Sequence, residues 1–150
     1  MQLCLFRKLL ILISFCFLAA LSLPAFAFDS NNIGEFAIVH RNGQLTDFTL
    51  RVSRLANQWK VQNQTESGLW QDLGCEGDCR LVESNKEEVA YFMGGEQPKD
   101  MTTQCIHNVA YAVCRVDIDD GSSQYLFIAL VAPPTAVNMV RVLHLPSGVE

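Results

Sequence analysis

Positive charge is scarce in this sequence of 150 residues. Lys and Arg together number 11 against 16 Asp and Glu, which gives a formal net charge of −5. A protein that binds the phosphate backbone of DNA or RNA needs clustered Lys and Arg side chains, so the composition excludes nucleic acid as the partner. Apolar residues make up 49% of the chain and charged residues 18%. These proportions are typical of one compact domain and exclude a disordered or collagen-like chain.

Recognisable catalytic and metal-binding motifs are also missing. The sequence has no HExxH pair, no GxSxG nucleophile motif and no P-loop. The histidines fall in three different segments, at His40, His107 and His144. We therefore expect no enzymatic activity, no cofactor and no metal site.

A long apolar run lies near the start of the chain. A short basic stretch precedes apolar residues 9–23, and AFA (25–27) has the small residues of a signal-peptidase site. Pro24 ends the run after about 15 residues, whereas a membrane-spanning helix needs roughly 20. We predict that residues 1–27 are a cleaved signal peptide and that residues 28–150 form a single domain. This domain would be periplasmic or secreted, with no stable membrane anchor.

Four cysteines remain in the predicted mature chain, at Cys75, Cys79, Cys105 and Cys114. An even number in an exported protein predicts two disulfides, because that compartment is oxidising. Loop entropy favours a long-range pairing, with roughly 4 kcal/mol for Cys75 to Cys105 against roughly 2 kcal/mol for a five-residue ring. Proximity favours Cys75 with Cys79 across a tight hairpin, CEGDC, and Cys105 with Cys114. We predict this local pairing. The cysteine spacing does not match a zinc site.

Apolar and polar residues alternate through most of the predicted domain, with turn residues every eight to twelve positions. The pattern predicts an all-β or β-rich fold with at most one short helix. We expect an antiparallel meander of eight or nine strands that forms a sandwich or a small barrel. The expected strands are 35–40, 45–55, 57–64, 69–73, 79–84, 87–93, 111–118, 124–132 and 137–145. Residues 100–113 fit both a helix and a strand, and we favour a short helical or irregular start before the strand from Tyr111.

Aromatic residues suggest one alternative function. Trp59 and Trp70 lie in successive predicted strands, where they could form a cross-strand pair or plug one end of a barrel. A barrel that carries a small apolar ligand would be lined by Trp59, Trp70, Phe92, Tyr111 and Tyr125.

Acidic side chains gather around CEGDC and again near residue 120. The surface that we select for partner binding consists of Asp72, Glu76, Gly77, Asp78, Glu83, Asp119 and Asp120. A rigid acidic loop suits docking into a cationic cleft, because complementary charge accelerates encounter. We therefore expect a non-enzymatic protein-binding module with a basic protein partner, such as an inhibitor or immunity protein that acts on a cationic toxin or cell-wall hydrolase. The other alternative is an accessory subunit of an envelope or secretion assembly, and the sequence does not indicate an oligomeric state.

Overall fold

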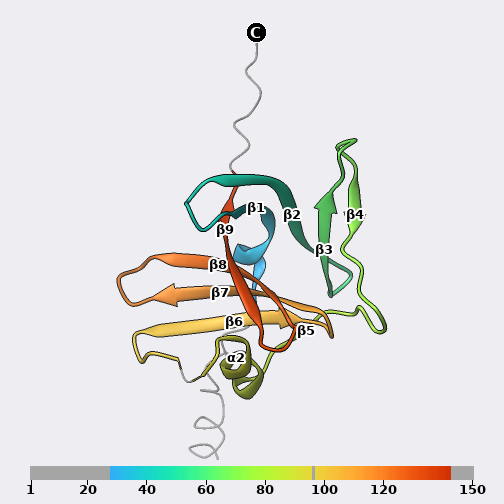
Figure 1. Ribbon diagram of the computed structural model, residues 1–150. Helices are drawn as coiled ribbons and strands as arrows, with labels where there is room; N and C mark the ends of the chain where they lie inside the picture. The colour runs from blue at the N-terminus through green and yellow to red at the C-terminus, as the bar shows by residue number, and fades with distance from the viewer. Residues whose placement is uncertain (1–27, 96, 143–150) are drawn as a thin grey trace, which may run out of the picture.

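The computed structural model in Figure 1 describes residues 28–95 and 97–142. The predicted signal peptide, His144 and the last residues of the strand expected at 137–145 lie outside these ranges. Within the described residues, no helix is long and apolar enough to cross a membrane.

Antiparallel strands dominate the described part of the chain (Figure 1). The elements are η1 (Ser30–Asn32), β1 (Gly34–Val39), β2 (Leu45–Leu55), β3 (Gln58–Gln64), β4 (Trp70–Asp72), β5 (Val82–Glu83), α2 (Lys86–Phe92), β6 (Met101–His107), β7 (Tyr111–Ile118), β8 (Ser123–Ala129) and β9 (Thr135–Arg141). They form one nine-stranded sheet in the order β4-β3-β2-β1-β9-β8-β7-β6-β5. The β-rich antiparallel prediction, with one short helix and two disulfides, is confirmed.

The sheet curls until its two sides meet. Its edge strands, β4 and β5, are consecutive in the chain, although they stand at opposite ends of the strand order. An isolated antiparallel bridge joins Trp59 of β3 to Leu81, the residue before β5. The segment 73–81, which we name the seam loop, therefore connects the two edges at the place where they approach one another.

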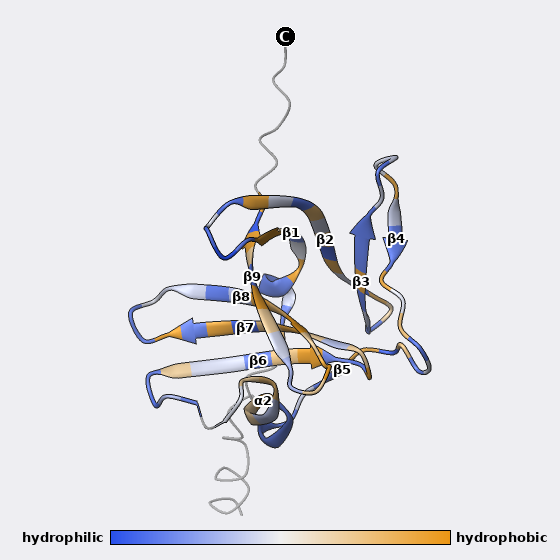
Figure 2. Ribbon diagram, in the orientation of Figure 1, coloured by the Kyte–Doolittle hydropathy of each residue, from blue (hydrophilic) through white to orange (hydrophobic). Residues whose placement is uncertain are grey.

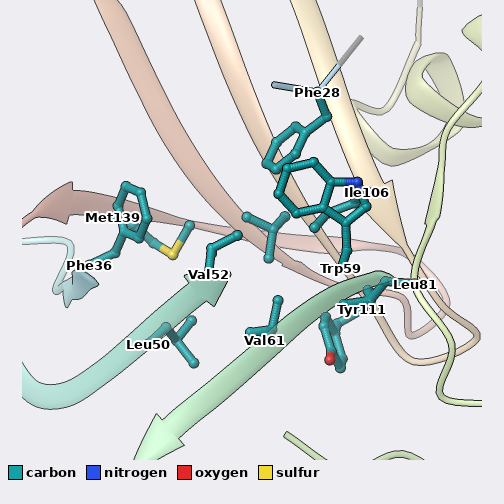
Figure 3. Packing of buried hydrophobic residues seen from close by; sticks show 11 residues of the cluster. Phe28, Phe36, Leu50, Val52, Trp59, Val61, Leu81, Ile106, Tyr111 and Met139 are labelled. Carbon is teal, nitrogen blue, oxygen red and sulfur yellow. The ribbon is translucent and has the colours of Figure 1, made fainter. Parts of the chain in front are cut away.

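The curled sheet encloses an inner core (Figure 3). Its buried members are Phe28, Phe36, Leu50, Val52, Trp59, Val61, Leu81, Ile106, Tyr111, Val113 and Met139. Phe28 packs edge-on against Trp59, with 5.0 Å between the ring centroids. Full burial of one large apolar side chain stabilises the fold by about 1.5–3 kcal/mol. This core is therefore the main source of stability, and it draws on both halves of the chain.

A second cluster lies on the other face of β6, β7 and β8. Alternate strand residues point to opposite faces, so Tyr111 and Val113 enter the inner core while Ala112 and Cys114 face the helix. We name this cluster the outer core, and its buried members are Val89, Phe92, Cys105, Ala112, Cys114, Val116, Leu126 and Ile128. Figure 2 shows the same alternation as hydrophilic and hydrophobic colours along the strands.

The predicted strand at 87–93 is wrong, because residues 86–92 form α2. Asn85 and Glu88 build a capping box, in which each side chain accepts a hydrogen bond from the other residue's backbone N–H. Val89 and Phe92, three positions apart, then share the buried face of the helix. The alternation in this segment was compatible with both structures, and the cap together with the outer core favours the helix.

The helical or irregular start at 100–113 is also wrong, since β6 occupies residues 101–107. Every residue of β6 pairs with β7, and Cys105 lies directly opposite Cys114. The predicted pairing of Cys75 with Cys79 and of Cys105 with Cys114 is confirmed. CEGDC is not the turn of a hairpin, however, because β4 pairs with β3 whereas β5 pairs with β6.

The β2–β3 turn yields a stability prediction. Ala56 and Asn57 both have positive φ, at 48° and 64°, as a two-residue type I′ turn requires. The left-handed conformation costs alanine about 1–2 kcal/mol. Replacing the pair by Asn-Gly (Ala56→Asn with Asn57→Gly) should raise the free energy of unfolding by about 1 kcal/mol in urea titrations.

Gly43 provides the matched control for this prediction. It has φ of +84° in the β1–β2 turn, so Gly43→Ala should lower the free energy of unfolding by about 1 kcal/mol. An Asn-Gly variant no more stable than the parent would contradict our description of the turn.

Candidate functional site

The seam loop is fixed to the body of the protein at both ends. At its start, the Leu73 N–H donates to the Val61 carbonyl at 2.9 Å. At its end, the Leu81 side chain is buried in the inner core beside Trp59. These anchors limit the movement of the loop relative to the sheet. Seven residues, 74–80, lie between them.

Asn108, which lies between β6 and β7, and Tyr111, the first residue of β7, hold the loop by hydrogen bonds. The Tyr111 hydroxyl donates to the Leu73 carbonyl at 3.3 Å, and the buried Asn108 side-chain amide donates to the Cys79 carbonyl at 3.3 Å. The Asn108 side-chain oxygen accepts from the backbone N–H groups of Ala110 and Tyr111. Burial raises the pKa of Tyr111 to about 12, so its hydroxyl remains a donor at physiological pH.

The tip of the loop is exposed and acidic. The Cys75–Cys79 disulfide closes it, and the Cys75 N–H lies 3.1 Å from Cys79 Sγ. Glu76, Gly77 and Asp78 are all exposed. Asp78 accepts from the Arg80 N–H at 3.0 Å and lies 3.5 Å from the Arg80 guanidinium. The disulfide and these local bonds therefore present two carboxylates on a short ring.

Two further residues of the predicted surface flank the seam loop. Asp72 is exposed on β4, where it accepts from Gln62 at 2.9 Å and lies 3.5 Å from Lys60 Nζ. Glu83 is exposed on β5. Since β4 and β5 border the loop on either side, Asp72, Glu76, Gly77, Asp78 and Glu83 belong to one continuous stretch of chain around the seam.

Asp119 and Asp120 lie elsewhere, in the turn between β7 and β8. The seam loop contacts the opposite end of β7, and this eight-residue strand spans roughly 25 Å. Figure 1 shows the seam loop on the right and this turn on the left. Hydrogen bonds from Ser122 lower the pKa of Asp120. The sequence thus grouped two acidic surfaces that the fold separates.

A hydroxyl–imidazole–carboxylate arrangement went unnoticed in the sequence. Ser84 Oγ lies 2.9 Å from His107 Nδ1, and Glu88 Oε1 lies 3.6 Å from His107 Nε2. The second distance exceeds a hydrogen bond, and the other Glu88 oxygen is used in the helix cap. We interpret these groups as a clamp that holds the start of α2 on β6. The Asn85–Glu88 spacing could have revealed the start of the helix, but His107 is brought beside it by the pairing of β5 with β6, which no local pattern shows.

The aromatic residues predicted to line a carrier pocket are only partly brought together. Trp59 and Tyr111 are buried in the inner core and Tyr125 packs against it, whereas Phe92 is in the outer core. Trp70 lies under the Arg51 guanidinium, 3.9 Å from the ring centroid. A hollow of about 660 Å³ lies instead beside the β1–β2 turn, where His40 and Ile38 contribute to its wall.

Comparisons of the chain with protein-family models, with curated proteins and with solved structures find no match. Among the described residues, no group of three or more His, Cys, Asp or Glu side chains could hold a metal ion. The two intramolecular disulfides indicate an oxidising, extracytoplasmic environment. The site must therefore be interpreted from its own chemistry.

The brace between Tyr111 and the loop gives a pH prediction. In the unfolded chain Tyr111 ionises near 10.0, and in the folded protein near 12. Its contribution to stability is therefore complete below pH 10 and is lost as the pH rises towards 12. Tyr111→Phe should cost about 1 kcal/mol at pH 8 through the lost hydrogen bond. At pH 11 the two proteins should have nearly equal free energies of unfolding.

Urea unfolding at both pH values measures the difference in free energy of unfolding between the two proteins. Ionisation of the other tyrosines affects both proteins equally and cancels in this difference. A wild-type advantage that stays constant from pH 8 to pH 11 would contradict the assigned role of the Tyr111 hydroxyl.

Proposed function

We propose that this protein is a non-enzymatic exported binding module whose seam loop docks on a basic protein. The observation that carries the proposal is an exposed acidic ring, closed by Cys75–Cys79, on a loop anchored at both ends. Loops held by a rigid scaffold are common binding elements. An inhibitor or immunity protein for a cationic cell-wall hydrolase or toxin is the role that fits best.

Rigidity supports the proposal on energetic grounds. A flexible loop loses conformational entropy when a partner orders it, at about 0.5–1.5 kcal/mol for each immobilised side chain. The contacts of Leu73, Cys79 and Leu81 with the sheet meet part of that cost before any partner arrives. The ring can then enter a concave site with little rearrangement.

The acidic charge of the seam loop and its bordering strands favours a basic partner. Asp72, Glu76, Asp78 and Glu83 are all exposed within the short stretch 72–83, so their fields add. A cationic cleft would meet complementary charge, which raises the association rate, and the effect weakens as salt is added. A neutral or acidic partner would gain nothing from this arrangement.

Location completes the proposal. Residues 1–27 would direct export and be removed after Ala27, so that Phe28, which is buried against Trp59, begins the mature domain. The periplasm or the outside of the cell would then be the compartment in which the module meets a cell-wall hydrolase or a toxin.

The test measures association rates with a panel of strongly basic muramidases, amidases and toxins in low salt. Glu76→Lys with Asp78→Lys should slow association at least about tenfold. The matched control, Asp100→Lys with Asp119→Lys, makes the same change of charge at the far end of β7, where the Asp119 N–H bonds the Asp100 carbonyl. This control should slow association less than about threefold.

Two results would overturn the proposal. Absence of binding to every basic partner would contradict the partner class. If only Asp100→Lys with Asp119→Lys slows association, the partner docks at the β7–β8 turn and not on the seam loop. Thermal unfolding of each variant checks that it folds, since the substituted side chains are exposed.

A further inference from the structure

The two disulfides of this chain differ sharply in accessibility. Cys79 is exposed and Cys75 is half-buried, within a loop whose residues 76–80 are all exposed. Cys105 is 2% exposed and Cys114 is 0% exposed. Val89 and Phe92 of α2 pack in the same cluster as that second bridge. An external thiol can reach the first bridge in the folded protein but not the second.

We propose that the Cys75–Cys79 bridge is a thiol–disulfide exchange site, attacked at Cys79, whereas the Cys105–Cys114 bridge is inert while the domain is folded. Exchange requires a thiolate to approach the attacked sulfur from the side opposite its partner, so access decides which bridge reacts. This inference is independent of the identity of any docking partner.

Reduction of the Cys75–Cys79 bridge takes two exchange steps. An external thiolate attacks Cys79 Sγ, the bond between the two sulfurs breaks, and Cys75 leaves as a thiolate that takes a proton from water. The product carries a mixed disulfide at Cys79. A second thiol of the same reactant attacks that mixed disulfide and leaves Cys79 as a thiol. The bridge is reduced by two electrons, and the two external thiols are oxidised to one disulfide.

The fold tolerates this reduction. The Cys75–Cys79 ring contains only five residues, and a ring of that size contributes roughly 2 kcal/mol of loop entropy, less than a long-range bridge would. After reduction the loop remains held by Tyr111 at Leu73 and by Leu81 in the inner core. The Cys105–Cys114 bridge joins neighbouring strands within the outer core, so its opening requires α2 to move away.

Charge in the ring selects the reactant. Glu76 and Asp78 stand between the two cysteines, and Asp78 forms an ion pair with Arg80. Like charge at separations of a few ångströms slows the approach of an anionic thiol by about threefold for each carboxylate in low salt. The reactant class is therefore a thiol or dithiol that is neutral or cationic around its sulfur.

To test this, the oxidised native protein is treated with dithiothreitol, cysteamine or glutathione, and free thiols are trapped with N-ethylmaleimide. The labelled peptides are then identified by mass spectrometry. We expect label on Cys75 and Cys79, none on Cys105 or Cys114 until the protein is unfolded, and a transient adduct on Cys79. At equal thiolate concentration, cysteamine should react faster than glutathione.

Charge-neutral variants test the selectivity. Glu76→Gln with Asp78→Asn should accelerate the glutathione reaction up to about tenfold and leave the reaction of cysteamine, whose attacking thiolate is a net-neutral zwitterion, within about twofold. Asp100→Asn with Asp119→Asn is the matched control and should change neither rate. Equal labelling of both bridges, or no labelling of Cys75 and Cys79 in the folded protein, would overturn the proposal. An adduct on Cys75 alone would overturn the assigned point of attack.

Discussion

The contact between Trp59 and Leu81 is the constraint on which the rest of this structure depends. It joins β3 to the residue before β5, and these two segments stand on opposite sides of a nine-stranded sheet. Without it the sheet would lie open, and its apolar inner face would meet water. With it, Leu81 and Trp59 complete the inner core around Phe28. Closure of the sheet and burial of the core are therefore one event.

The seam loop is a direct consequence of this closure. The chain must pass from one edge of the sheet to the other, and it does so in nine residues between Asp72 and Val82. Tyr111 and Asn108 hold this crossing from the β6–β7 side. Because the loop is anchored, its carboxylates cannot move into the core and remain exposed to solvent. The acidic surface and its rigidity have the same structural origin.

Local patterns in the sequence predicted most strands, the two disulfides and the β7–β8 turn, because alternation and cysteine spacing act over short distances. Residues 87–93 were assigned to a strand on alternation alone, whereas the Asn85–Glu88 cap begins a helix there. The grouping of Asp119 with Glu76 was made on shared charge alone, and the pairing order of the sheet separates them. The β1–β9 pairing and the Trp59–Leu81 bridge join distant parts of the chain. Their positions depend on how the whole apolar surface is buried, which no local pattern records.

The central claim is that a basic partner docks on the seam loop and on the strands that border it. Amide hydrogen exchange of the complex with a basic partner, compared with the free protein, tests this claim most directly. The account predicts slower exchange in residues 72–83 and unchanged exchange in residues 117–123. Protection confined to residues 117–123, with none in the seam loop, would contradict it.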